Sequence, residues 1–222
     1  MVPLRAILFD LDGTLLDTAP DMVGALNALR REEDLPPMLY EAVRPAVSHG
    51  AARIVKSGFP DVSAEHFAEL QKRFLEIYRG ALSQGTRLFP GMERVLDDLA
   101  ARGLKSGIVT NKPAWLTEPL LQQLELRGRF ECVVSGDTLA QRKPDPEPLL
   151  HAAKLAGVRA EECVYVGDAE RDVQAAHAAG MPALVASYGY LNIAEDAALW
   201  RGDAYLLKAL DLLPWLDASG RA

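Results

Sequence analysis

The stretch FDLDGTLLD, residues 9–17, places a cluster of aspartates directly after an apolar run. That run, Ala6–Phe9, predicts a buried strand. Asp10 stands at its end, Asp12 follows two residues later, and Gly13 opens a turn. Burying a carboxylate without a partner is expensive. The pattern therefore predicts a positively charged partner at the end of this strand.

Composition limits the class of protein. The chain has 222 residues, 49% hydrophobic and 25% charged, which is typical of a globular protein with one sizeable core, or a core plus a small second unit. The net charge of −7, without a basic stretch, argues against a general nucleic-acid or membrane partner. A locally positive site for an anionic substrate stays open. With neither a membrane-spanning apolar run nor a signal-peptide pattern, we expect a cytoplasmic protein.

Beyond residue 90, strand-like runs alternate with helical patterns. We expect strands at 104–111, 130–137, 162–168 and 182–187, and a last short one at 203–207. The two cysteines, Cys132 and Cys163, lie in such runs and are predicted to be buried, inert thiols. Alternation of this kind predicts a Rossmann-like α/β fold, a parallel sheet with helices on both faces.

Residues 18–82 break this alternation, because helical patterns follow one another there without a strand-like run. They cover 20–34, 40–58 and 63–82. We therefore predict an α/β core of residues 1–17 and 83–222, interrupted after its first strand by a helical domain of residues 18–82. The hinges are expected near residues 15–19 and 83–90.

Ligands of open parallel sheets bind beyond the carboxyl ends of the strands. The candidates at these positions are Asp10, Asp12, Thr110, Asn111, Asp168 and, one helical turn further on, Asp172, joined by Lys143 where a helix opens between them. Carboxylates gathered at one point repel each other unless a cation joins them. Hard oxygen ligands without His or Cys suit Mg²⁺ better than Zn²⁺. The two last aspartates also suit the first turn of a helix, which is compatible with metal binding.

These residue types can perform phosphoryl transfer. Mg²⁺ and Lys143 can neutralise a phosphate lying against Asp10, and the Thr110 hydroxyl can bind a phosphate oxygen. The Asp10 carboxylate can then attack phosphorus, giving an aspartyl-phosphate that water hydrolyses. Asp12 can protonate the leaving group and later deprotonate the water.

Four motifs carry a resemblance to a known family: FDLDGT, the threonine of IVTNK, Lys143 of RKPDP, and GDAERD. In this order and over the whole chain, they resemble the haloacid dehalogenase-like phosphatases. The resemblance implies Asp10 as nucleophile and Asp12 as general acid/base, with Thr110 and Lys143 binding phosphate. It also implies Mg²⁺ held by Asp10, the Asp12 carbonyl and Asp168, supported by Asp172. The helical insertion lies where one subgroup of that family carries its cap domain.

Two branches of the family stay open. TNKP at 110–113 with KPDPEP at 143–148 resembles the phosphoglycolate phosphatases, which we take as the first expectation. VSHGAARIV at 47–55 and the tail from ASYGY resemble the N-acetylmuramic acid 6-phosphate phosphatases of cell-wall recycling. A phosphosugar mutase of the same fold, a dehalogenase and a non-catalytic binding protein are the alternatives. The expected partner is a small phosphorylated metabolite, and the expected state a monomer or homodimer.

Specificity is expected in the helical insertion. Arg44, His49 and Arg53 surround Gly50, where Ser48, His49 and Gly50 predict a break in the helix and a loop facing the substrate. Arginine suits a substrate carboxylate bidentately. With Asn111, these three residues are the predicted substrate-binding set, whereas Lys112 is predicted to lie on the surface.

Overall fold

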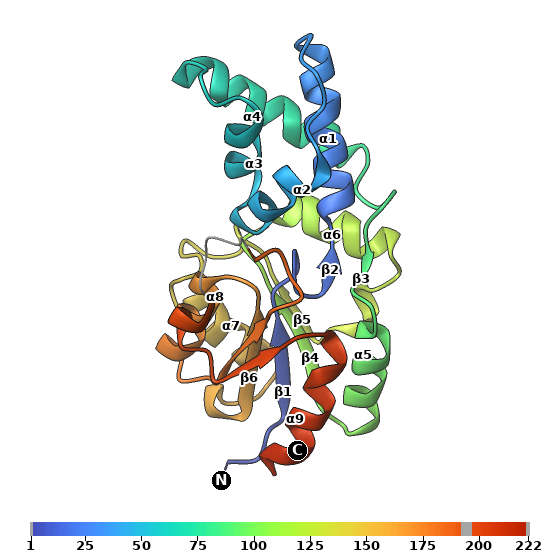
Figure 1. The fold of residues 1–222 in the computed structure, drawn as a ribbon. Coiled ribbons are helices and arrows are strands. Elements are labelled where there is room, and N and C mark those ends of the chain that lie inside the picture. Colours follow the sequence, from blue (N-terminus) through green and yellow to red (C-terminus); the bar gives the residue numbers. More distant parts are fainter. Residues whose placement is uncertain (1, 192–196, 221–222) are drawn as a thin grey trace.

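The computed structural model describes residues 2–191 and 197–220. Its centre is a six-stranded, wholly parallel sheet in the order β5-β4-β1-β6-β7-β8 (Figure 1). The strands are β1 Ala6–Phe9, β4 Lys105–Val109, β5 Cys132–Val134, β6 Cys163–Gly167, β7 Ala183–Ala186 and β8 Ala204–Leu206. The predicted α/β fold is confirmed, and β8 is the short last strand expected at 203–207.

Both faces of the sheet are covered, as the apolar composition of the strands requires. In β1, Ile7 and Phe9 pack into one hydrophobic cluster, and Ala6 and Leu8 pack into a second cluster on the opposite face. Helices α5, α6 and α9 contribute to the first cluster, and α7 and α8 to the second. Their bounds are α5 Met92–Ala101, α6 Ala114–Gln123, α7 Glu147–Leu155, α8 Glu170–Ala178 and α9 Leu212–Ser219.

Four further helices follow β1 and form a helical cap, the name used below for α1 to α4. They are α1 Ala19–Glu32, α2 Tyr40–Val43, α3 Ala51–Gly58 and α4 Ala64–Arg79. Figure 1 shows them beyond the carboxyl ends of the strands. The helical cap predicted after the first strand is thus present, whereas the exact domain bounds 18–82 stay a prediction. Within the described residues, no helix combines the length and the apolarity that crossing a membrane would require.

The helical pattern predicted at 40–58 is divided into three pieces. A 3₁₀ helix, Arg44–His49, separates α2 from α3 and begins beside Pro45, which has no backbone N–H to donate. Gly50 ends it with φ of 80°, a conformation that favours glycine. The break predicted at Ser48-His49-Gly50 is therefore confirmed. Shorter 3₁₀ turns lie at Arg127–Arg129, Ala160–Glu162, Ala197–Trp200 and Ala209–Asp211.

A two-stranded antiparallel ribbon connects the cap to the core. It pairs β2, Leu16–Asp17, with β3, Arg87–Leu88, and thus joins the two segments predicted as hinges. Buried Asp21 reinforces it: its carboxylate accepts the backbone N–H groups of Gly85 and Thr86 at 2.6 and 2.8 Å, and the Thr86 hydroxyl at 2.6 Å. The sequence did not predict these strands, because two residues are too few to show a period.

Candidate active site

Three neighbouring strands end at the same point, beneath the cap. Asp10 follows β1, Thr110 follows β4, and Asp168 follows β6. All three side chains are buried. Because β1 lies between β4 and β6 in the sheet, the parallel topology places these side chains together at the carboxyl edge.

Lys143 supplies a positive charge at this edge. Its Nζ lies 2.9 Å from Asp10 Oδ1 and 2.8 Å from Asp172 Oδ1, and its side chain is completely buried. The same ammonium donates to the Val109 carbonyl at 2.9 Å and to the Tyr165 hydroxyl at 2.6 Å. Such a fixed, dry cation strongly favours an anion beside it.

The acidic cluster is larger than Lys143 alone can neutralise. Oxygens of Asp10, Asp168 and Asp172 lie within 4.8 Å of one another. Burial, and then the neighbouring carboxylates, raise the pKa of Asp168 to about 7, and burial also raises the pKa of Asp10. Among the described residues, Asp168 Oδ1 has no hydrogen-bond partner. An all-oxygen cluster with an unsatisfied buried carboxylate oxygen fits a hard divalent cation such as Mg²⁺.

At Gly13 the backbone approaches the acidic cluster so closely that no side chain fits at this position. Gly13 has φ of +84°, and a Cβ there would lie 2.0 Å from Asp168 Oδ2. Asp168 Oδ2 already accepts the Ser48 hydroxyl at 2.6 Å and the Tyr190 N–H at 3.0 Å. Gly13 therefore allows the first motif to turn beside the acidic cluster, and Ser48 links the cap to it.

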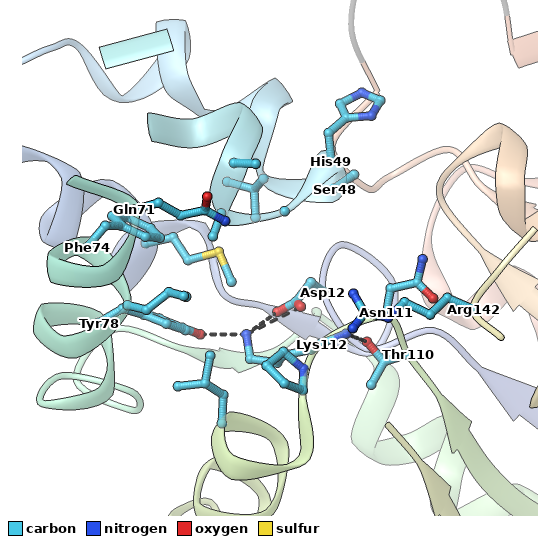
Figure 2. Close-up of a pocket in the computed structure, with 18 of the residues that line it drawn as sticks. Asp12, Ser48, His49, Gln71, Phe74, Tyr78, Thr110, Asn111, Lys112 and Arg142 are labelled. Carbon is cyan, nitrogen blue, oxygen red and sulfur yellow. Dashed lines mark hydrogen bonds and ion pairs between the residues drawn. The ribbon is translucent and has the colours of Figure 1, made fainter. Parts of the chain in front are cut away.

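Asp12 lies at the edge of the cavity. Its Oδ1 accepts the Thr18 hydroxyl at 2.7 Å and the Lys112 ammonium at 3.0 Å. Lys112 also donates to the hydroxyl of Tyr78 on α4, at 2.9 Å (Figure 2). The prediction that Lys112 lies on the surface is wrong: only 7% of the residue is exposed, and its charge is paired with the partly buried Asp12 and the buried Tyr78 hydroxyl. Burial raises the pKa of the Tyr78 phenol to about 12, so the phenol stays protonated.

A cavity of about 460 Å³ lies between the cap and this edge of the sheet, within the usual range for small-molecule sites. The polar groups on its core side belong to Asp10, Asp12, Thr110, Asn111, Lys112, Arg142 and Arg171. The cap side is mostly apolar, and its larger side chains are Met22, Val47, His49, Gln71, Phe74, Leu75 and Tyr78 (Figure 2).

The predicted substrate-binding residues have different positions. Asn111 and His49 line the cavity, although in Figure 2 the His49 ring points away from Asp12. Asn111 also exchanges hydrogen bonds of 3.0 and 3.1 Å with the backbone of Lys143, which fixes that loop. Arg44 and Arg53 are not among the lining residues: the Arg44 guanidinium stacks on the Tyr190 ring at 4.8 Å, and Arg53 is exposed.

Two other arginines line the cavity instead. Arg171, within the GDAERD motif, donates to the Ser48 carbonyl at 2.6 Å and lies 3.9 Å from Asp10 Oδ2. Arg142 immediately precedes Lys143. Sequence reasoning missed both, although their place within two of the motifs was a usable signal.

The fold and the site together define an α/β protein in which a buried lysine and an acidic cluster that could hold a cation lie under a helical cap. The chain belongs to the haloacid dehalogenase-like hydrolases, whose family model matches residues 7–186. This finding confirms the predicted family.

Similar proteins cover almost the whole chain. A phosphoglycolate phosphatase of Xanthomonas campestris pv. campestris is 46% identical over 199 residues, covering 90% of both chains. An N-acetylmuramic acid 6-phosphate phosphatase of Pseudomonas putida is 36% identical, covering 97% of both. Among solved structures, a predicted phosphoglycolate phosphatase of Haemophilus somnus 129pt superposes with a TM-score of 0.86 at 27% identity, covering 97% of this chain and 99% of that one. The predicted enzyme class, a phosphoric monoester hydrolase, is confirmed.

Proposed function

We propose that this enzyme hydrolyses a small phosphomonoester with Mg²⁺, through an aspartyl-phosphate on Asp10. The supporting observation is the position of Asp10, whose carboxylate touches the Lys143 ammonium and belongs to the acidic cluster beside the cavity. Asp10, Asp168 and the Asp12 carbonyl would hold the metal, with Asp172 in support. When bound, Mg²⁺ supplies positive charge that offsets the phosphate and the carboxylates.

The chain's own residues account for both halves of the reaction. Lys143 and the Thr110 hydroxyl hold phosphate oxygens, so that an Asp10 oxygen faces phosphorus. As the new bond from Asp10 to phosphorus forms, the bond to the leaving oxygen breaks, and Asp12 gives that oxygen a proton. Asp12 then removes a proton from water, the water oxygen bonds to phosphorus, and the bond to Asp10 breaks, releasing inorganic phosphate.

The first candidate substrate is 2-phosphoglycolate. Relatives that are 42–46% identical to this chain carry the name phosphoglycolate phosphatase. The cavity also offers cations for an anionic substrate, since Arg142 and Arg171 both line it. We assign the binding of the substrate carboxylate to Arg142 and Arg171, which line the cavity, rather than to Arg44 and Arg53, for which the sequence predicted it.

A second candidate, N-acetylmuramic acid 6-phosphate, is favoured by the size and lining of the cavity. A volume of about 460 Å³ is more than a two-carbon acid fills. The apolar cap wall of Met22, Phe74 and Leu75 suits a sugar with acetyl and lactyl groups better than a small anion.

A phosphate-release assay decides between the candidates. We would compare kcat/KM for both substrates with Mg²⁺ and with EDTA, using Asp10→Asn as the inactive variant and Asp61→Asn, an exposed carboxylate, as its control. Full activity of Asp10→Asn or in EDTA would contradict the proposed chemistry. A requirement for a sugar bisphosphate would indicate a mutase. Absence of turnover with any phosphomonoester would indicate a binding protein. The cytoplasmic location and the monomeric or homodimeric state stay predictions.

A further inference from the structure

Lys112 is a buried lysine to which the mechanism above gives no role. Only 3% of its side chain is exposed, and lysine is rarely buried to this extent without a partner. Its ammonium contacts both oxygens of Asp12, at 3.0 and 3.3 Å, and the Tyr78 hydroxyl at 2.9 Å. The buried charge is thus directed at the residue that transfers the proton.

The two oxygens of Asp12 are held differently. Oδ1 accepts two short hydrogen bonds, from the Thr18 hydroxyl at 2.7 Å and from Lys112 at 3.0 Å. Within the described residues, Oδ2 receives only the longer contact of 3.3 Å from Lys112. The carboxylate is therefore anchored through Oδ1, and Oδ2 is the oxygen left to carry a proton into the cavity that Asp12 lines.

Tyr78 connects this arrangement to the cap. It belongs to α4, it is fully buried, and its ring centroid lies 4.6 Å from the Lys112 ammonium. Figure 2 shows Lys112 between Tyr78 on one side and Asp12 on the other. The lysine thus fixes Asp12 against a cap helix as well as against its own loop.

We propose that Lys112 is a positioning residue for proton transfer, which with Tyr78 and Thr18 orients the Asp12 carboxyl so that Oδ2 faces the leaving oxygen. This inference rests on the proposed phosphatase chemistry. In the step concerned, the proton passes from Asp12 Oδ2 to the leaving oxygen as its bond to phosphorus breaks and the bond from Asp10 forms. Lys112 touches neither the phosphate nor the leaving group in this role.

The role is tested by the dependence of activity on the leaving group. An alkoxide needs a proton to leave, whereas p-nitrophenolate leaves without one. The alkyl substrate is whichever of 2-phosphoglycolate and N-acetylmuramic acid 6-phosphate the enzyme hydrolyses. In Lys112→Met, we expect its kcat/KM to fall roughly 100-fold, which is the lower end of the rate enhancement that a general acid supplies. With p-nitrophenyl phosphate we expect a fall of less than about fivefold, because that step gains little from the acid. The parameter kcat/KM is the right one, since it reports on steps up to formation of the aspartyl-phosphate.

Three further variants separate positioning from general structural damage. Tyr78→Phe keeps the lysine charge and should show the same selective loss to a smaller degree, and Lys112→Arg should recover part of the alkyl activity. Lys105→Met removes a lysine that donates to the Ala156 carbonyl and does not line the cavity. It should leave kcat/KM unchanged for both substrates. Adding Lys112→Met to Asp12→Asn should cause little further loss, because the lysine acts through Asp12.

Each outcome supports or overturns the proposal. Equal losses for both substrates would mean that Lys112 binds phosphate or only supports the fold, and no loss would mean that Asp12 is oriented without it. If Lys112→Met fails to fold, Tyr78→Phe and Lys112→Arg decide: uniform effects on both substrates overturn the proposal. A wild-type protein that hydrolyses neither substrate would instead refute the proposed function.

Discussion

Replacing Lys143 with methionine should destabilise the metal-free protein severely. Lys143 is completely buried and forms ion pairs with Asp10 and Asp172 at 2.9 and 2.8 Å. Removing one partner of a buried ion pair leaves an uncompensated charge, at a cost of about 3–5 kcal/mol. The two pairs share one ammonium, so their costs do not add. For a chain of this size, such a loss corresponds to a fall in Tm of about 6–20 °C.

The assay is thermal and urea unfolding in EDTA, between pH 5 and pH 8. A carboxyl group whose pKa is raised in the folded state binds its proton more tightly there than in the unfolded chain. Its contribution to stability is therefore complete at low pH and is lost as pH rises, for Asp168 through about 7. Without Lys143, stability should fall more steeply as pH rises. The difference in free energy of unfolding between the wild type and Lys143→Met should therefore be largest at pH 8 and smaller at pH 5.

The matched control is Lys105→Met, whose lysine makes one hydrogen bond, to the Ala156 carbonyl, and no ion pair among the described residues. We expect this control to lose at most about 1.5–3 kcal/mol at any pH, the value of a single hydrogen bond to a charged group. If Lys143→Met were as stable as Lys105→Met at pH 8 in EDTA, the reasoning that Lys143 compensates the buried carboxylates would be refuted.

Three further predictions follow from other features. Mg²⁺ should raise the Tm of the wild type in a concentration-dependent way, and Asp168→Asn should abolish most of this rise; an equal rise in both would place the metal elsewhere. Cys132 and Cys163, whose pKa values burial raises to about 11 and 12, should not react with a thiol reagent at pH 8 until urea unfolds the chain. Asp21→Ala should lower the free energy of unfolding by about 2–4 kcal/mol, because it leaves the N–H groups of residues 85–86 without their acceptor; urea titration measures this, and a loss below 1 kcal/mol would contradict it.

The core of the site could be predicted because strand ends and topology were both visible in the sequence. Asp10, Thr110 and Asp168 each follow a buried apolar strand, and a parallel sheet brings such strand ends together. Position along the chain therefore determined position in space for these residues. Their proposed roles additionally depend on chemistry that their residue types supply.

The contacts across the cavity could not be predicted in the same way, because they do not follow from the order of strands in a sheet. Lys112 pairs with Asp12, 100 positions away, and with Tyr78, 34 positions away. A lysine after a strand looks the same in sequence whether it is buried or solvated. Arg44 was expected at the substrate because it lies near Gly50, but the chain directs it onto Tyr190 instead.

The ribbon of β2 and β3 has a consequence for how this fold can change. By pairing Leu16 with Leu88, it brings the two ends of the long helical insertion together at one point on the core. The entropic free-energy cost of closing such a loop grows only with the logarithm of its length, by about 0.6 kcal/mol for each doubling. Helices can thus be lengthened, shortened or exchanged above the ribbon at little cost to the folding of the sheet. Substrate preference can diverge in evolution while the phosphate chemistry below stays the same.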